Sequence, residues 1–342
     1  MKVFFQYIIA ALLFSLAFWG ITYTSDWINY EYYFDKDMTM KSDVASFFIF
    51  NFLKEYDFDY RAAFRVHIAL MSLLYPLVFV RMRQNPIPYT ILFIIFVYVP
   101  VANQIRYYVA FPIAILAIIS FSEHKFFQAI IWSIVGFAFH STIIVLFGVI
   151  GFYYFYVVRK RRFYRNKFYY FGGVVLAFLV LPLLSLLPKE FVDDYSKYSD
   201  TENISSFIGG LYTMMPKFTA LFLIFLAHNK ICRNNPDVIY HNERMYFLLW
   251  TFSVATAFLI PLGFSIQIFV YRFVTPMLVF QVMYFAYAGR NQLVRKKIHT
   301  NISIIVILSI TLLWQTYLSY WLHITNSPID TELLLILSSY QL

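Results

Sequence analysis

The chain has 342 residues, of which 61% are hydrophobic, 22% aromatic and 13% charged. A soluble domain of this length carries roughly twice that charged fraction, so a soluble globular protein is excluded. The net charge of +9 does not indicate nucleic acid, because the charges fall between apolar runs of about 20 residues, each long enough to cross a bilayer. Cys232 is the only cysteine, which excludes an intramolecular disulfide and a cysteine-based metal cluster.

The first apolar run, within "MKVFFQYIIAALLFSLAFWGITYTSDW", resembles a signal peptide at first sight. It extends for about 17 residues, whereas such peptides have about 7–15, and bulky Trp19 stands where a cleavage site has small residues. We therefore expect a retained first helix.

Apolar runs of this kind continue along the chain. We expect an all-α integral membrane protein, a polytopic helical bundle of about eleven transmembrane helices in a single membrane domain, 1–342. The expected crossings are 3–23, 62–80, 89–103, 105–121, 127–140, 142–158, 168–188, 210–228, 245–262, 266–288 and 302–322.

The positions of Lys and Arg orient this bundle with its N-terminus in the cytoplasm. Most of the 27 basic residues then fall in inner loops, as the positive-inside rule requires. These inner residues are Lys2, Arg81, Arg83, Lys125, the run "RKRRFYRNK" (159–167), Lys230, Arg233, Arg244, Arg290 and "RKK" (295–297).

The segment 128–158 has two alternative interpretations. One continuous helix of about 31 residues would be about 46 Å long, would overshoot the bilayer and would place "RKRR" outside. A hairpin that turns at "FAFHSTI", near His140, keeps the basic loops inside, although no Gly or Pro marks the turn. We favour the hairpin.

Two segments are expected on the outer face. Residues 24–61 include "FFIFNFLKEYDFDY" and are typical of an interfacial segment. Residues 189–209 are polar and acidic, and we expect a mobile loop or a short helix there. Asp26, Tyr30 and Glu31 open the interfacial segment. They form either a solvated aromatic belt or a carbohydrate site, in which carboxylates contact sugar hydroxyls and aromatic rings stack on sugars.

Three residues within or beside the crossings have chemistry that an apolar environment disfavours. Arg106 and Arg272 stand near the outer ends of two helices that run inwards, each after a Gln (Gln104, Gln267), beside a Tyr (Tyr107, Tyr271) and before a Pro (Pro112, Pro276). Each Arg is either snorkelling to headgroups or binding phosphate oxygens, which the guanidinium does bidentately. His140, followed by Ser141, is either a packing residue or a catalytic one.

At these residues the sequence resembles the EpsG-like group of Wzy-type bacterial polysaccharide polymerases. The resemblance rests on three segments in order: Asp26, Trp27 and Tyr30; Asn103, Arg106 and Ala110; and Phe139, His140 and Ser141. Arg272 fits the pattern, and the likeness spans about residues 18–290. The sequence departs from the family in having Thr24 and Ser25 before the Asp, and Tyr107 directly after the Arg.

The resemblance implies a GT-C-like architecture and a polymerase in the bacterial cytoplasmic membrane, with its active site facing the periplasm or the outside. The expected substrate is an undecaprenyl-pyrophosphate-linked oligosaccharide, and the reaction joins the growing glycan to a new unit. Membrane lipid surrounds the chain, and a flippase and a chain-length regulator are the candidate protein partners. No nucleic acid, cofactor or metal is expected.

The residue roles follow from combining the resemblance with the side chains. Arg106 and Arg272 are expected to bind pyrophosphate, and His140, or failing that Asp26, to remove the acceptor proton. The residues expected to bind sugar are Tyr30, Glu31, Gln104, Tyr107, Ser141, Gln267 and Tyr271.

Three other functions compete with this assignment. A flippase also needs intramembrane Arg, but it favours charges in the middle of the bundle. A polysaccharide ligase shares the donor chemistry and usually has a larger outer loop than 189–209. An O-acetyltransferase would need an inner-side constellation that the inner loops do not offer.

Overall fold

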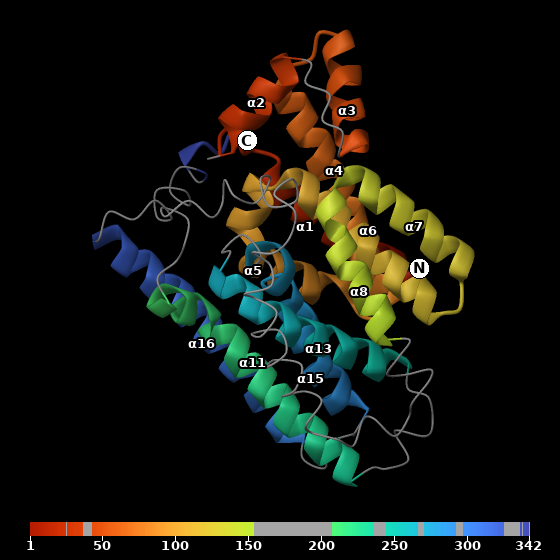
Figure 1. Ribbon diagram of the computed structural model, residues 1–342, viewed down its shortest axis with the longest axis vertical. Coiled ribbons are helices and arrows are strands. Elements are labelled where there is room, and N and C mark those ends of the chain that lie inside the picture. Colours follow the sequence, from red (N-terminus) through yellow and green to blue (C-terminus); the bar gives the residue numbers. More distant parts are fainter. Residues whose placement is uncertain are drawn as a thin grey trace, which may run out of the picture. The chain divides into compact units, whose positions relative to one another are not determined.

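The protein is described by a computed structural model that covers residues 1–24, 26–36, 43–153, 207–234, 244–265, 270–291, 297–324, 336 and 338–341. These residues form twelve α-helices with short 3₁₀ and π turns (Figure 1), so the expected all-helical architecture is confirmed for them. The expected crossing 168–188, the basic run 159–167 and nearly all of the outer loop 189–209 lie outside the described residues.

The chain divides into two compact units. The first contains Met1–Ile150 and Gln315–Leu342, and the second contains Gly151–Trp314. The single membrane domain expected from the sequence stays a prediction, and each unit is described by itself.

The first unit is a bundle of apolar helices. Its members are α1 (Lys2–Phe18), α4 (Tyr60–Arg81), α5 (Pro86–Asn103), α6 (Ile105–Ser122), α7 (Phe126–Phe139) and α8 (Ile144–Tyr153). Within the described residues, α4, α5 and α6 are long and apolar enough to cross a membrane, and α1 and α7 are shorter apolar helices. The chain is thus an integral membrane protein, while the inward or outward direction of each helix stays a prediction.

Helix α1 ends earlier than the expected crossing 3–23. After Phe18 the chain turns at Gly20, whose backbone oxygen accepts a hydrogen bond from the N–H of Gln341. A Cβ at Gly20 would lie 2.5 Å from the Gln341 oxygen and 2.6 Å from the Tyr340 ring. The close approach of the C-terminal residues therefore requires the turn and the glycine.

Helix α6 lies at the centre of this bundle. Every residue of it is buried except Arg106 and Phe121, which are partly exposed. It packs along α7, and Gly136 permits this contact, because a Cβ there would lie 2.7 Å from Ile143 Cδ1 and 3.2 Å from Ile113 Cγ2. The position of α7 relative to α6 is therefore sterically constrained.

The chain breaks at His140, as the hairpin interpretation predicted. Helix α7 ends at Phe139, His140 is extended (φ −160°, ψ 118°), and a 3₁₀ turn, η1 (Ser141–Ile143), leads into α8. The imidazole Nδ1 accepts the N–H of Thr142 at 3.4 Å and so caps the next turn. The His140 side chain thus stabilises a turn in which other proteins often have Gly or Pro.

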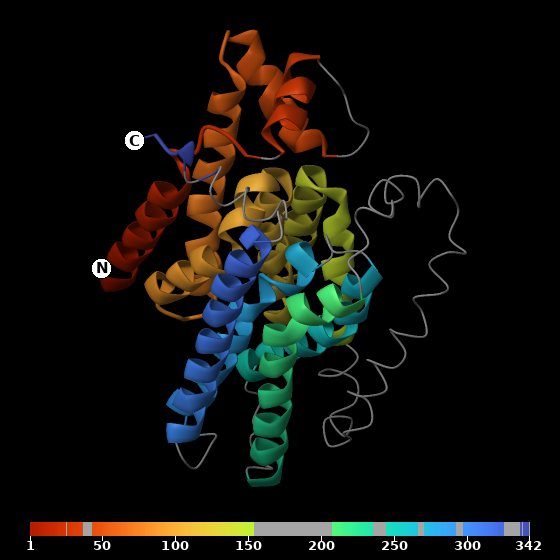
Figure 2. The same cartoon turned by 90° about the vertical axis from the view of Figure 1, so that its left-hand side faces the viewer.

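The segment 24–61 folds as two short helices, α2 (Trp27–Asp35) and α3 (Val44–Glu55), beside the start of α4. Figure 2 shows them projecting beyond one end of the bundle of the first unit. They bury an aromatic cluster of Trp27, Tyr30, Phe34, Phe47, Phe50, Tyr60 and Phe64. A stripe of Val44, Phe48, Phe52 and Tyr56 stays exposed along α3, an arrangement that suits a helix in contact with lipid.

The second unit contains the later helices. They are α11 (Phe207–Asn234), α13 (Arg244–Ser265), α15 (Met277–Arg290) and most of α16 (Lys297–Ile324), whose residues from Gln315 on belong to the first unit. The expected crossing 266–288 is divided, because a π turn, η5 (Val270–Val274), precedes Pro276 and α15 starts after it. Pro276 is the N-cap of α15, where its missing N–H costs nothing, because the first residues of a helix have no intrahelical acceptor.

A buried polar cluster ties three helices of this unit together. His228 Nδ1 lies 2.6 Å from the Tyr246 hydroxyl, and that hydroxyl lies 3.1 Å from the hydroxyl of Tyr284. The His228 ring also stacks on Trp250, with ring centroids 3.6 Å apart. The cluster satisfies polar atoms that would be costly to bury alone.

Candidate functional site

The site is organised around Arg106, in the first turn of α6. Gln104 has non-helical angles (φ −118°, ψ 52°) and separates α5 from α6, so the chain turns directly before the arginine. The Arg106 side chain is 11% exposed, and its Nη1 lies 2.8 Å from Oδ2 of Asp43, which is 5% exposed. A largely buried guanidinium therefore has a buried carboxylate as its counter-ion.

Two aromatic rings from the interfacial segment flank this guanidinium. Its central carbon lies 4.9 Å from the centroid of Tyr30, on α2, and 5.3 Å from the centroid of Phe47, on α3. Cation–π contacts of this kind contribute about 0.5–2 kcal/mol each, more where water is excluded. The segment thus covers Arg106 and fixes the position of its charge.

Asp43 holds an unusual backbone conformation for a non-glycine residue. It stands directly before α3 with φ 65° and ψ 34°, in the left-handed region that Asp and Asn tolerate better than most residues. Its side chain makes no capping hydrogen bond to α3. Its carboxylate instead points to the ends of α6 and α7.

The second oxygen of this carboxylate reaches the break after α7. Asp43 Oδ1 accepts the N–H of Ser141 at 3.1 Å and lies 3.5 Å from His140 Nδ1. Asp43 therefore joins Arg106 and His140, which the sequence predicts separately as functional residues.

The His140 ring has a defined surrounding. Tyr107, one residue after Arg106, meets it edge to face with centroids 5.6 Å apart. Its Nδ1 lies 3.3 Å from Thr142 Oγ1 and accepts the Thr142 N–H at 3.4 Å. Because Nδ1 accepts there, the proton of the neutral ring is assigned to Nε2.

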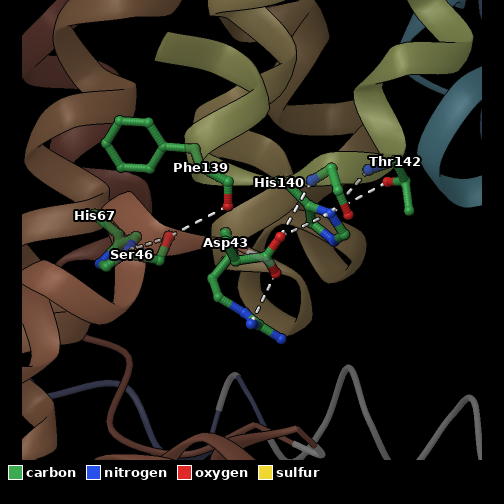
Figure 3. Close-up of polar contacts among 8 residues, drawn as sticks. Asp43, Ser46, His67, Phe139, His140 and Thr142 are labelled. Carbon is green, nitrogen blue, oxygen red and sulfur yellow. Dashed lines mark hydrogen bonds and ion pairs between the residues drawn. The ribbon is translucent and has the colours of Figure 1, made fainter. Parts of the chain in front are cut away.

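A second histidine, His67, connects the helices that carry the site residues. His67, fully buried on α4, lies with Nδ1 2.8 Å from the Ala63 carbonyl and with Nε2 3.3 Å from Ser46 Oγ. Ser46 Oγ also donates to the Phe139 carbonyl at 3.5 Å (Figure 3). These contacts connect α3 to α4 and to the end of α7, and so hold Asp43 against His140.

The predicted acid of the interfacial segment is not the one at this centre. Asp26 directly precedes α2, and Glu31 is exposed on that helix, whereas the carboxylate that contacts Arg106 and His140 belongs to Asp43. The sequence interpretation missed Asp43. The signal available was an Asp directly before the apolar run "VASFF", in the position of a helix N-cap.

The remaining predicted residues are placed as follows. Ser141 contributes its backbone N–H to Asp43, and Tyr30 is buried beneath Arg106. Arg272 stands in the π turn η5, and such turns are frequent at functional positions. Arg272 belongs to the second unit and Arg106 to the first, so a joint pyrophosphate site stays a prediction. Gln267 lies outside the described residues, as does the side chain of Tyr271.

The described residues hold no group of three His, Cys, Asp or Glu side chains that could bind a metal ion. The cluster instead combines a permanent cation with a carboxylate and an imidazole. Such a set can stabilise an oxyanion at the guanidinium and transfer a proton at the ring.

The family of the chain follows from a comparison of its sequence with models of protein families. A sequence model of the EpsG family matches residues 5–329. The chain belongs to the EpsG family. The matched range contains Asp43, Arg106, His140 and Arg272, so the whole candidate site lies within the EpsG region. The EpsG family is generally associated with exopolysaccharide biosynthesis. No curated protein and no solved structure matches the chain.

Proposed function

We propose that the chain is a polymerase of lipid-linked oligosaccharide repeat units. It transfers the growing glycan from undecaprenyl pyrophosphate to a sugar hydroxyl of a new lipid-linked unit. The observation that carries the proposal is the buried Arg106, held with Asp43 and His140 at one end of helices that are apolar enough to cross a membrane. Such a charge is expensive in an apolar setting and is typically retained for a functional reason.

Each residue has a part in this reaction. Arg106, and in the second unit Arg272, stabilises the negative charge that develops on the departing pyrophosphate. His140 accepts the proton of the acceptor hydroxyl. The lipid pyrophosphate bond supplies the free energy, so no nucleotide takes part. The flanking residues Tyr107 and Tyr30 order the imidazole of His140 and the guanidinium of Arg106.

The orientation of the substrate follows from the same proposal. The site faces the periplasm or the outside, where the lipid-linked units are presented. The carrier lipid lies between helices, and its pyrophosphate reaches the end of the bundle. A flippase that presents the units and a regulator of chain length are the proposed partners.

The direct test in the cell is a gel of surface polysaccharide from a strain that lacks the gene. The strain is complemented with the wild-type chain or with Arg106→Ala, Arg272→Ala or His140→Ala. Deletion should reduce the ladder to a single lipid-attached repeat, and the variants should fail to restore it. Arg81→Ala is the matched control, because Arg81 forms a similar 2.8 Å pair with Glu123 at the opposite end of α6.

Two other outcomes would each overturn the proposal. A strain that presents no repeat at its surface after deletion would indicate a flippase. A strain that accumulates long polymer on the lipid carrier would indicate a ligase.

A further inference from the structure

The carboxylate of Asp43 is shared between two groups with different tasks. One oxygen pairs with Arg106 at 2.8 Å, and the other lies 3.5 Å from His140 Nδ1. The distances show that the pair with Arg106 is the closer one. In this arrangement the carboxylate neutralises the guanidinium and is only loosely associated with the imidazole.

Arg106 has donors that Asp43 does not use. A guanidinium carries five N–H groups, but Asp43 approaches it with one oxygen. The Nη1–Oδ2 ion pair lacks the aligned geometry of a hydrogen bond, and the buried Nε has no hydrogen-bond partner among the described residues. An anion with several oxygens would satisfy this guanidinium better than the carboxylate does.

The Thr142 contact assigns to the imidazole the tautomer that cannot act as a base at Nε2. Its Nδ1 accepts the Thr142 N–H, so Nε2 carries the proton. The opposite tautomer needs an acceptor at Nδ1, and the charged acceptor within reach is the Asp43 carboxylate at 3.5 Å, beside the neutral Thr142 Oγ1 at 3.3 Å. In this tautomer Nε2 cannot take a proton, so the base is inactive.

We propose that Asp43 is an internal anion that occupies Arg106 until the donor phosphate displaces it, and that it then activates His140. This inference rests on the proposed function of the chain and assigns a positioning role to Asp43. Donor binding and acceptor activation become coupled, because one carboxylate serves both groups.

The coupled reaction balances as follows. Phosphate oxygens take over Arg106, and the imidazole gives its Nε2 proton to water and takes a proton from water at Nδ1. The released Asp43 accepts the hydrogen bond of this Nδ1–H, so that the lone pair lies on Nε2. His140 Nε2 takes the proton of the acceptor hydroxyl while its oxygen forms a bond to the anomeric carbon. The bond from that carbon to the pyrophosphate oxygen breaks, and the electron pair leaves with the lipid pyrophosphate. Asp43 stabilises the imidazolium that results.

The local structure permits this exchange. The Asp43 side chain is not committed to capping α3, and both of its partners lie within 3.5 Å. Only a small rotation of the carboxylate separates the two states. The contacts of Ser46 with His67 and with Phe139 hold the backbone of α3 in place during the exchange.

The test measures binding and turnover separately in the same variants. The full chain is purified in detergent and titrated calorimetrically with inorganic pyrophosphate, and polymer length is scored in complemented cells. Asp43→Asn keeps the shape and tolerates the left-handed conformation. We expect it to bind pyrophosphate about tenfold more tightly, as a competing anion has been removed, and to make little polymer.

Further variants complete the experiment. Arg106→Gln should lose pyrophosphate binding, and Asp43→Glu should return the affinity towards wild type. The matched control is Glu123→Gln, which changes the carboxylate of the Arg81 pair and should change neither pyrophosphate binding nor polymer length. Asp43→Gly, which is unstrained at φ 65°, replaces the Asn variant should that fail to purify. Weaker or unchanged pyrophosphate binding in the neutral variants would overturn the inference.

The two proposals fail in different ways. Suppose that Asp43→Asn binds pyrophosphate more tightly and that the ladder is normal after gene deletion. The proposal that phosphate displaces Asp43 then stands, and the proposal that the chain is a polymerase is rejected. Suppose instead that the ladder collapses on deletion and that Asp43→Asn binds pyrophosphate more weakly. The polymerase proposal then stands, and the proposal that phosphate displaces Asp43 is rejected.

Discussion

Asp43 Oδ2 lies 2.8 Å from Arg106 Nη1, and this buried ion pair joins the start of α3 to the start of α6. The pair holds the interfacial segment, residues 24–61, against the membrane helices of the first unit. Removing one member of such a pair leaves an uncompensated charge and typically costs about 3–5 kcal/mol. The fold and the chemistry of the site therefore depend on the same contact.

The first prediction concerns the coupling of these two residues. Arg106→Met leaves Asp43 buried without its cation and should lower the unfolding temperature of the purified chain by several degrees. Adding Asp43→Asn should restore part of the loss, because the uncompensated charge is removed. Thermal unfolding of both single variants and of the double variant measures this. Additive losses would contradict the coupling.

The second prediction separates charge from shape at Arg106. Arg106→Lys keeps the charge and loses the planar fork that binds two phosphate oxygens, so we expect polymer synthesis to fall at least about tenfold. Arg81→Lys, at the end of α4, should leave the polymer unchanged, because Arg81 pairs with Glu123 at the opposite end of α6. Full-length polymer with Arg106→Lys would exclude bidentate binding of phosphate.

The third prediction contrasts two histidines. His67→Ala removes a fully buried ring that bonds Ala63 and Ser46, and it should destabilise the chain by about 2–4 kcal/mol. The protein that still folds should lose only part of its polymerase activity, because the contact of Ser46 with Phe139 still holds α3 at the end of α7. His140→Ala should lose about 1 kcal/mol with the cap of η1 and should make no polymer. Unfolding temperatures together with activity per folded molecule distinguish the two roles.

The fourth prediction concerns the polar cluster of the second unit. Tyr246→Phe removes the hydroxyl that contacts His228 at 2.6 Å and Tyr284 at 3.1 Å. The variant leaves buried polar atoms without this partner and should cost about 1–3 kcal/mol. Polymer length should not change, because we give the cluster a structural role. A shortened ladder at normal stability would instead place the cluster in the reaction.

Much of the helical layout follows from the sequence, because each long apolar run must form a helix to satisfy its backbone in lipid. The break at His140 was also predictable, since a continuous helix there would have overshot the bilayer. The sequence did not reveal that the His140 imidazole caps the turn that follows the break.

The centre of the site was harder to predict. Asp26 and Asp43 are both acids of the interfacial segment, and their spacing gives no reason to choose between them. The choice is made by the tertiary packing of α2 and α3 on α4, which turns the carboxylate of Asp43 towards Arg106. Contacts of this kind link helices distant in sequence, so local patterns do not encode them.

The most direct measurement uses the purified wild-type chain in vesicles. The single lipid-linked repeat extracted from the gene-deleted strain is added, and the glycan length on the lipid is followed by mass spectrometry. Our account predicts a series of lengthened lipid-linked glycans with the release of undecaprenyl pyrophosphate, and no lengthening with Arg106→Ala. Repeat units that stay single with the folded wild-type chain would contradict it.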